Sequence, residues 1–264
     1  MMNEPARSDE AGPPLVEVRD LAVSYLLRSR GTPSLRDLVA WRRRERRRVF
    51  WALDDITVSF FKGQVIGVVG PNGAGKSTLC LALAGILAPS RGSVLLRANL
   101  SALLTLGAGY NQDLSGRENM RLYGAFLGFR RDEMEERLDE AIEFSELGMF
   151  IDEPIRTYST GMRARLSFSV ATMLEPEIMI LDEILAVGDR RFQFKAQRRI
   201  DSMMEKSKLI IIVSHSLGFL RNVCTDVLWL DRGRLRQFGA VEAVLEAYEA
   251  ASGDPAAKAA PGTP

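Results

Sequence analysis

The chain has 264 residues, of which 46% are hydrophobic, and its 35 Lys+Arg residues almost balance its 34 Asp+Glu residues. This length and composition are typical of a soluble globular protein that folds as one large α/β domain or two small ones. The sequence has no apolar stretch of the roughly 20 residues that cross a bilayer, no secretory signal at its start and only two cysteines, so we expect no membrane-spanning, secreted or disulfide-stapled protein.

The first third of the chain predicts strands around one helix. Alternating or continuous apolar residues indicate strands at 15–25, 51–61 and 65–69. The last of these is almost wholly apolar, which is typical of a strand buried on both faces. The pair Lys62-Gly63 predicts a hairpin turn, and a helix is expected over 77–87. A basic stretch, 26–48, contains a short helical pattern, and we expect the Pro-rich residues 1–14 to be disordered.

Helices and buried strands alternate in the remainder of the sequence. Helical spacing of apolar residues predicts a helical insert from 116 to 147 and helices at 163–174 and 239–251. Buried strands are expected at 178–181 and 209–213. This alternation implies a mostly parallel sheet that is covered on both faces. We expect an α/β domain over 15–251, with a helical subdomain at about 116–156 that continues to 174, and a flexible tail over 252–264.

The strongest motif lies between the buried strand at 65–69 and the following helix. Its sequence matches the phosphate-binding pattern G-x-x-x-x-G-K-[ST] in the context that the pattern requires. Glycines let the backbone curl so that its N–H groups converge on one point, and the helix start adds a positive dipole end. Lys76 can reach the β- and γ-phosphates, and the Ser77 hydroxyl can coordinate Mg²⁺. A plain Gly-rich turn accounts poorly for the whole pattern. The predicted nucleoside triphosphate site comprises Gly70, Pro71, Asn72, Gly73, Ala74, Gly75, Lys76, Ser77 and Thr78.

Two further strand ends carry polar residues suited to the same chemistry. Asp182 closes one buried strand and can hold Mg²⁺ through water, while Glu183 is placed to accept a proton from attacking water. Taken alone, an Asp-Glu pair is more simply a surface strand end. His215, the only histidine, follows the strand at 209–213 and can hydrogen-bond a γ-phosphate. Without the other strand ends, a solvent-exposed turn histidine would be the better interpretation.

These motifs, in this order, resemble the nucleotide-binding subunit of an ATP-binding cassette (ABC) transporter. The segment Tyr158-Ser-Thr-Gly-Met162, which leads into a helix, is similar to the family signature Leu-Ser-Gly-Gly-Gln and retains Ser159 and Gly161. In this family the signature of one subunit covers the γ-phosphate that a second subunit holds. A hydroxyl, a glycine and a helix N-terminus suit that contact, although Ser-x-Gly before a helix is also an ordinary cap.

The resemblance covers about residues 15–250 and implies a P-loop NTPase fold. The fold has a mostly parallel core sheet, an antiparallel β subdomain and a helical subdomain. It places Tyr25 where family members stack an aromatic ring on adenine; the alternative is an ordinary edge-strand tyrosine. It places Asp189 at the subunit interface and gives His215 the role of the switch histidine. It implies ATP and Mg²⁺ as cofactors.

One departure from the family pattern concerns the loop that normally supplies a glutamine to Mg²⁺ and water. The expected position falls on Thr105, and Gln112 lies nearby but shifted along the loop. This loop, the signature and the segment Asp-Glu-Ile-Leu-Ala-Val-Gly-Asp189 resemble the branch that exports O-antigen, capsular polysaccharide or teichoic acid. The insert before Phe50 is similar to theirs as well. Some members carry a C-terminal carbohydrate-binding domain, which we do not expect beyond Ala251.

An arginine-rich segment is not explained by the shared motifs. It follows a helical pattern with Trp41 and contains Arg42, Arg43, Arg44, Arg46, Arg47 and Arg48. It could bind the anionic cytoplasmic leaflet or an anionic lipid-linked substrate, or it could be a solvated helix end. The near-zero net charge and the lack of an aromatic platform argue against nucleic acid.

The sequence thus predicts the ATP-hydrolysing subunit of an ABC transporter that exports a lipid-linked polysaccharide such as O-antigen, capsule, cell-wall glycan or teichoic acid. We expect a homodimer that docks on two copies of an integral-membrane permease at the cytoplasmic face of the membrane. The alternatives are an exporter ATPase for a lipid or drug, a soluble ABC ATPase without transport function, and a nucleotide-gated binding module with negligible turnover. The polysaccharide substrate rests on the resemblance alone.

Overall fold

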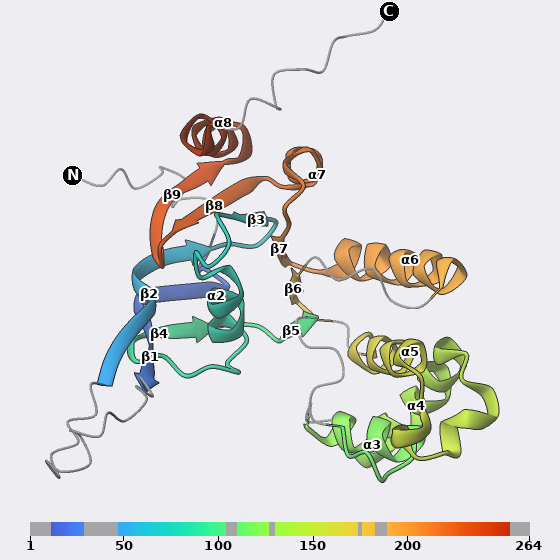
Figure 1. Ribbon diagram of the computed structural model, residues 1–264. Coiled ribbons are helices and arrows are strands. Elements are labelled where there is room, and N and C mark those ends of the chain that lie inside the picture. Colours follow the sequence, from blue (N-terminus) through green and yellow to red (C-terminus); the bar gives the residue numbers. More distant parts are fainter. Residues whose placement is uncertain are drawn as a thin grey trace, which may run out of the picture. The chain divides into compact units, whose positions relative to one another are not determined.

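The computed structural model describes residues 12–28, 47–103, 110–126, 130–173, 176–182 and 189–253. They divide into two compact units, drawn together in Figure 1. The first unit takes residues up to 61, then 67–96, and the residues from 216 onward. The second unit takes 62–66 and 97–215. Each unit is described by itself below.

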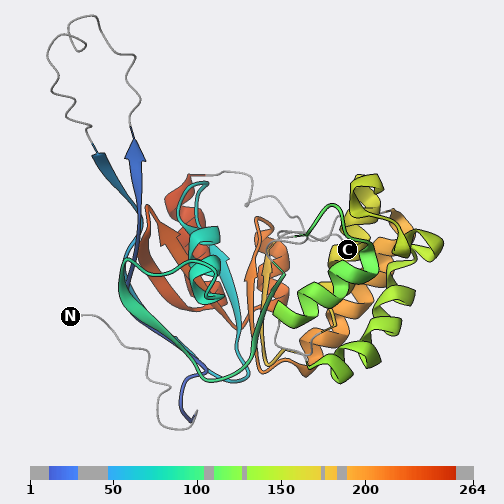
Figure 2. The ribbon, with the colours of Figure 1, turned by 90° about the horizontal axis from the view of Figure 1, so that it is seen from below.

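The first unit contains a three-stranded antiparallel sheet in the order β2-β1-β4. Its strands are β1 (Val16–Arg28), β2 (Arg47–Phe60) and β4 (Arg91–Leu96). β1 and β2 form the long ribbon that Figures 1 and 2 show in blue. The ladder is irregular beyond Val18, where Asp20 has a φ of 48°. Gly92 on β4 has a φ of 74°, and a Cβ there would lie 2.2 Å from the Arg19 carbonyl oxygen, so only glycine fits beside this bulge.

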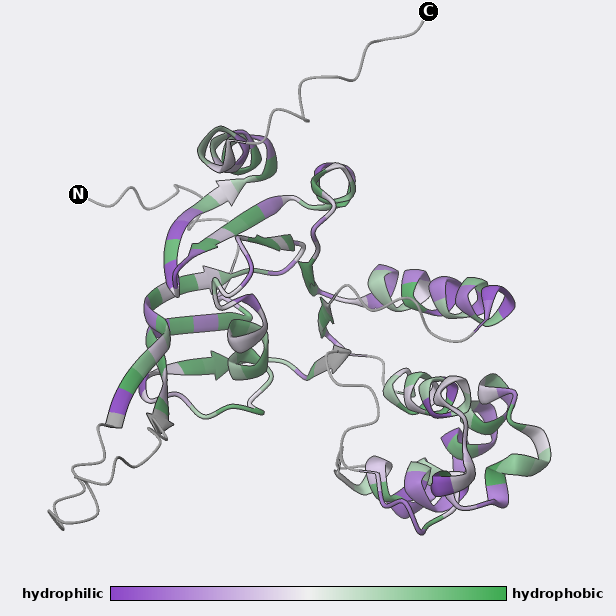
Figure 3. Ribbon diagram, in the orientation of Figure 1, coloured by the Kyte–Doolittle hydropathy of each residue, from purple (hydrophilic) through white to green (hydrophobic). Residues whose placement is uncertain are grey.

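The rest of the first unit surrounds the phosphate-binding loop at residues 70–78, called the P-loop below. It comprises the end of β3 (Val65–Val69), α2 (Lys76–Leu83), α7 (Leu217–Val223), β8 (Asp226–Asp231), β9 (Arg234–Ala240) and α8 (Val241–Ser252). β8 pairs antiparallel with β9, and α8 packs on these two strands (Figure 1). The Trp229 and Tyr248 rings meet edge to face at 5.5 Å across that contact. In Figure 3, β3 and β8 are mostly green, because both consist largely of buried apolar residues.

The second unit contains parallel strands in the order β5-β6-β7, followed by the start of β3. These are β5 (Leu100–Leu103), β6 (Ile178–Asp182) and β7 (Leu209–Val213). Every residue of β7 is buried, as expected for a parallel strand covered on both faces. The amphipathic helix α6 (Arg190–Lys206) joins β6 to β7 and buries Phe192, Ala196 and Ile200 on one face.

A helical bundle completes the second unit. It contains α3 (Gly116–Phe126), α4 (Arg131–Ser145), the short 3₁₀ helices η1 (Gly148–Asp152) and η2 (Ile155–Thr157), and α5 (Thr160–Ala171). Met120, Met134, Leu138, Ile155 and Leu166 form the centre of its apolar cluster. Among the described residues, no helix is both long enough and apolar enough to span a bilayer.

Several sequence-based expectations are corrected in detail. The turn at Lys62-Gly63 exists, but it joins two different sheets and is not a hairpin, because β2 pairs with β1 and β3 lies in the other sheet. The helix expected over 77–87 ends at Leu83, and Gly85 follows with a φ of 70°, a conformation that stops helices. The helix expected from 163 begins at Thr160. The helical pattern at 35–41 lies outside the described residues.

Candidate nucleotide-binding site

At two glycines of the P-loop, neighbouring backbone atoms of the first unit lie so close that no side chain fits. Gly70 has a φ of 149°, and a Cβ there would lie 2.2 Å from the Leu230 carbonyl oxygen. Gly75 has a φ of 103°, and its Cβ would lie 2.7 Å from the Ala52 carbonyl oxygen. Because an added methyl group would overlap backbone atoms at both positions, the loop can pack here only with glycine.

Backbone hydrogen bonds hold the loop in place. The Ala74 N–H donates to the Pro71 carbonyl at 3.0 Å, and the Gly233 N–H donates to the Ala74 carbonyl at 3.0 Å. Helix α2 begins after Gly75, and no side chain caps its first turn. The N–H groups and the positive dipole end of a helix start can bind an anion. Asn72, Gly73 and Ser77 are exposed, so the loop surface is open to a ligand.

Lys76 lies inside the curl of the loop. Its Nζ donates hydrogen bonds to the Gly70 carbonyl at 2.7 Å and the Pro71 carbonyl at 3.2 Å. The residue is only 8% exposed, which is unusual for lysine. The ammonium group is therefore already located where phosphate oxygens would enter, and a nucleotide can replace carbonyl contacts with charge-assisted ones.

Tyr25 belongs to the same unit as the P-loop. It lies on β1 opposite Phe50 of β2, and its side chain is 40% exposed. The neighbouring Leu26 and Phe50 are also exposed, by 64% and 49%. An exposed ring is available for stacking on a base, but the same exposure suits an edge-strand tyrosine, so the adenine contact stays a prediction.

The second unit brings two other predicted positions to one sheet edge. Asp182, the last residue of β6, pairs in register with Val213, the last residue of β7, and the exposed His215 follows two residues later. The carboxyl ends of parallel strands are where ligands bind in such sheets. The Asp182 side chain and the whole of Glu183 lie outside the described residues. No cluster of three metal-ligating side chains occurs in the part of the chain that the structure describes.

These donors fit Mg²⁺ rather than a metal that needs a full protein cage. Mg²⁺ takes oxygen ligands and is usually held by one or two protein groups together with substrate phosphates and water. Ser77 offers an exposed hydroxyl at the start of α2, and Asp182 offers a carboxylate at a strand end. Taken separately, the hydroxyl in the first unit and the carboxylate in the second are both oxygen donors of the kind that Mg²⁺ accepts.

The signature segment lies at the start of α5. Tyr158 is buried and donates its hydroxyl proton to the Phe150 carbonyl at 2.5 Å; burial raises its pKa. Ser159 caps the helix, and its Oγ accepts a hydrogen bond from the Met162 N–H at 3.2 Å. At Gly161 a Cβ would find only the Ser159 Oγ at 3.9 Å, and its φ is not positive. The unit's own packing therefore does not require glycine at this position.

The loop that contains Gln112 is tied to the lead-in of the signature. The Arg156 N–H donates to the Gln112 carbonyl at 3.0 Å, and the Ile155 N–H donates to the Leu114 carbonyl at 3.0 Å. Gln112 is exposed. Thr105, the other candidate for the glutamine role, lies outside the described residues, so the choice between them stays open.

Asn119, which the sequence analysis did not assign, organises this loop. It is fully buried, and its Oδ1 accepts from the Asn111 N–H at 2.8 Å. Its Nδ2 donates to the carbonyls of Asn111, Leu114 and Ser115 at 2.9 to 3.2 Å. An asparagine in the first turns of an expected helix gives a weak signal, because only the folded loop shows four partners around one amide.

Asp189 begins α6. Its Oδ1 accepts a hydrogen bond from the Phe192 N–H at 3.0 Å, and its Oδ2 pairs with Arg165 of α5. The first contact, helped by Arg165, lowers the pKa of this carboxyl below its usual range. Arg48 is exposed and Arg47 begins β2, whereas Arg42, Arg43, Arg44 and Arg46 lie outside what the structure describes.

A buried strand, a glycine-rich loop with an inward lysine and an uncapped helix define a P-loop nucleotide-binding protein. A family model described as "ABC transporter" matches residues 53–186. The O-antigen export system ATP-binding protein RfbB of Klebsiella pneumoniae is 40% identical over 242 residues, which are 90% of this chain and 98% of that relative. The chain therefore belongs to the ABC transporter family and is an ATPase domain of that family.

Other relatives agree with this assignment. The teichoic acids export ATP-binding protein TagH of Enterococcus faecalis is 41% identical over 201 residues, which are 76% of this chain and 45% of that protein. A solved structure described as an ATP binding subunit of an ABC transporter superposes with a TM-score of 0.66 at 23% identity. It covers 89% of this chain and 93% of its own, so the two proteins share the α/β fold.

Proposed function

We propose that this chain is the ATP-hydrolysing subunit of a transporter that exports a lipid-linked polysaccharide across the cytoplasmic membrane. The observation that carries the substrate class is the identity of 40% over 98% of a relative named for O-antigen export. The P-loop supports ATP as the energy source, since its backbone and Lys76 are arranged to bind phosphate groups.

Hydrolysis follows from positioning and charge stabilisation. The N–H groups around Gly75 and the Lys76 ammonium hold the β- and γ-phosphates. Ser77 and Asp182 would hold Mg²⁺, which when bound neutralises charge between these phosphates. Glu183 accepts a proton as a water oxygen attacks the γ-phosphorus and the bond to the ADP oxygen breaks. His215 donates a hydrogen bond to the γ-phosphate. Tyr25 stacks on the adenine ring.

Two copies of the chain form the working unit. Ser159 and Gly161 at the start of α5 cover the nucleotide that the other copy holds, and Asp189 lies at the same seam. The open space around Gly161 supports this arrangement, because its own unit makes no demand for glycine there. An approaching phosphate would make that demand.

The dimer docks on two copies of an integral-membrane permease and is peripheral to the cytoplasmic face of the membrane. The helical subdomain at about 116–156 contacts the permease. The basic segment Arg42 to Arg48 contacts the membrane surface or the anionic substrate. The near-neutral net charge of the whole chain gives it no general attraction to nucleic acid.

The test is reconstitution of the chain with its permease in vesicles that contain a lipid-linked glycan. We expect ATP-dependent transfer of the glycan and ATPase activity that Glu183→Gln abolishes while closed dimers accumulate with ATP. Glu205→Gln, at an exposed position on α6, is the matched control and keeps both activities. Transport of a drug or a plain lipid instead, failure of the chain to bind any permease, or no ATP turnover at all would each overturn the proposal. Hydrolysis by Glu183→Gln at the parental rate would disprove the assignment of the base.

A further inference from the structure

An ion-pair network joins the start of α6 to α5 and to the end of α4. Arg165 of α5 pairs with Asp189 through one Nη and with Glu146 through the other, at 3.5 Å in the second case. Glu146 in turn pairs with Lys195 of α6 at 3.1 Å. Arg165 is thus shared by two carboxylates that come from different segments.

Aromatic packing fixes the Arg165 guanidinium. Its Cζ lies 5.0 Å from the centre of the Phe192 ring, and Phe192 packs edge to face with Phe144 and Phe168 at 5.7 and 6.1 Å. The Arg165 side chain is only 20% exposed. A guanidinium that lies on an aromatic face and forms ion pairs in two directions has little freedom to reorient.

The network connects two stretches that the proposed dimer needs. Arg165 is six residues beyond Ser159 on one continuous helix, a rise of about 9 Å. Asp189 directly follows residues 183–188, which begin with Glu183 in the sequence. Asp189 is 60% exposed, and exposed ion pairs contribute little to stability. The pair with Asp189 therefore adds little stability of its own, whereas it does fix the distance between the two contact points.

We propose that Arg165 is a positioning residue that holds Asp189 at the start of α6 in a fixed relation to Ser159 at the start of α5. This inference rests on the proposed function, because both points act only when a second copy of the chain closes over ATP. Arg165 itself contacts no nucleotide. It makes the start of α5 and the start of α6 move as one piece.

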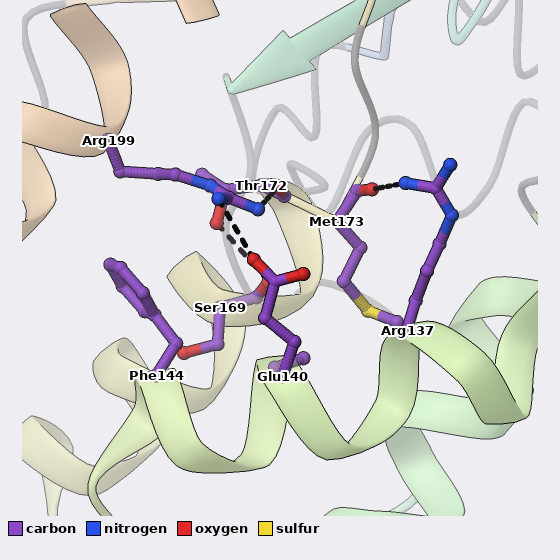
Figure 4. A pocket seen from close by; sticks show the side chains of 8 residues that line it. Arg137, Glu140, Phe144, Ser169, Thr172, Met173 and Arg199 are labelled. Carbon is purple, nitrogen blue, oxygen red and sulfur yellow. Dashed lines mark hydrogen bonds and ion pairs between the residues drawn. The ribbon is translucent and has the colours of Figure 1, made fainter. Parts of the chain in front are cut away.

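The opposite end of α5 offers a matched comparison. There Arg199 of α6 donates to the Thr172 carbonyl at 3.0 Å and pairs with Glu140 of α4 at 3.0 Å (Figure 4). Arg137 donates to the Met173 carbonyl at 2.7 Å (Figure 4). Arg199 thus links the same three helices as Arg165, but at the end of α5 that is remote in sequence from Ser159.

The experiment compares Arg165→Gln with Arg199→Gln. We expect both to unfold within a few degrees of the parent and to bind ATP as monomers within about twofold of it, because neither residue belongs to the P-loop. Arg165→Gln lowers kcat about tenfold or more and weakens ATP-dependent dimerisation, and Arg199→Gln does not. Arg165→Lys recovers part of the kcat, since one ammonium keeps the charge but cannot serve two carboxylates equally.

A second variant distinguishes the effect of the Arg165–Asp189 ion pair from the effect of Asp189 as the N-cap of α6. Asp189→Asn keeps an N-cap side chain of equal quality but loses the charge that pairs with Arg165. We expect it to reproduce the kcat loss of Arg165→Gln, and the double variant to add little more. If Arg165→Gln lowers kcat no more than Arg199→Gln, or if the two losses add fully, the inference is wrong.

Hydrogen exchange of the isolated chain gives a readout that needs no ATPase activity. Arg165→Gln should speed exchange of the amides at 190–193, where α6 begins, and Arg199→Gln should not. Equal exchange in both variants would overturn the inference even if the transporter works as proposed. Faster exchange in Arg165→Gln alone would support it even if the polysaccharide transport assay fails.

Discussion

Glycines in the two nucleotide-related motifs are present for different physical reasons. At Gly70 and Gly75 the neighbouring backbone leaves no space for a Cβ, and both have left-handed φ values. At Gly161 the space is open and the φ is not positive. The first two positions are set by folding within one copy of the chain. The third has no such reason, and this contrast makes a separate test of folding and assembly feasible.

Gly161→Ala should leave the fold intact but disable assembly. Alanine is favoured over glycine in a helix by about 1 kcal/mol, so we expect an unfolding temperature equal to or above that of the parent. ATP-dependent dimerisation of the Glu183→Gln background should be lost, because the added methyl group meets the partner's phosphate. Thermal unfolding and size-exclusion chromatography with ATP and Mg²⁺ measure the two effects.

Gly218→Ala is the matched control for this substitution. Gly218 is also the second residue of a helix with a serine cap, and a Cβ there would meet nothing within 4 Å. It should keep dimerisation. A Gly161→Ala protein that dimerises as well as this control would show that the signature does not face the nucleotide.

Lys76→Met should abolish nucleotide binding at small cost to stability. The change keeps the aliphatic stem and removes the Nζ that bonds the Gly70 and Pro71 carbonyls. Losing bonds from a charged donor costs about 1.5–3 kcal/mol, which is partly offset because no charge is then buried. Titration with a fluorescent ATP analogue should show no saturable binding, while urea unfolding shifts only slightly. Lys62→Met, at an exposed turn, should bind as the parent does. Retained affinity in Lys76→Met would place the nucleotide elsewhere.

Among the elements, the loop at 111–115 depends on one side chain from α3. The Asn119 amide bonds four backbone groups of this loop. Glu118 adds a cap at the same place, accepting from the N–H and hydroxyl of Ser115. These contacts lower the pKa of Glu118. Side chains of α3 therefore add to the backbone bonds that tie this loop to residues 155 and 156.

Asn119→Ala should destabilise the second unit by about 2–4 kcal/mol, because it leaves several backbone groups unpaired next to a fully buried position. Urea unfolding followed by circular dichroism measures this loss. Asn111→Ala, which removes an exposed side chain that bonds only the Asp113 N–H, should cost much less. Equal effects of the two changes would mean that the buried amide does not organise the loop.

Most elements with a strong pattern could be predicted from the sequence, although the buried strand β8 was not, and those defined by partners could not. β3, β6 and β7 are short apolar runs and were found within a residue of their ends. The start of α5 was missed by three residues, because Ser159 sets it through a cap. β4 and β9, mostly exposed or half-buried, were not predicted, since their pairing partners and not their patterns make them strands.

The candidate site divides in the same way. The P-loop could be predicted residue by residue because a local sequence determines the whole curl. The roles of Asn119 and Arg165 could not, because each depends on groups distant in the chain that only folding brings together. A single sequence contains no signal for such partners beyond ordinary helical spacing.

At the scale of the whole molecule, the carboxyl groups with altered titration are unevenly distributed. Among the described residues, those with a lowered pKa are Glu118, Glu135, Asp152, Glu177 and Asp189. All of them belong to the second unit. Arginine or lysine side chains lower most of these values, through the pairs Arg117–Asp152, Arg121–Glu135 and Lys208–Glu177. The acid response of the protein should therefore differ between its two units.

Each of these exposed carboxyls contributes little to stability, but because all of them lie in the second unit, we expect acid to destabilise that unit slightly before the first. A carboxyl whose folded pKa lies below its unfolded value contributes stability above the unfolded pKa and loses it as pH falls through the folded pKa. Unfolded Asp and Glu titrate at about pH 4, so the loss of stability begins there and grows toward lower pH. Hydrogen exchange at stepwise lower pH, corrected for the intrinsic rate, should show α3 and α4 losing protection while β8 and β9 keep theirs. Glu135→Gln, which removes the charge paired with Arg121, should make the protection of α3 and α4 less dependent on pH. Glu246→Gln, at an exposed position of α8, should leave that dependence unchanged. Simultaneous loss of protection in both units would show that they unfold as one.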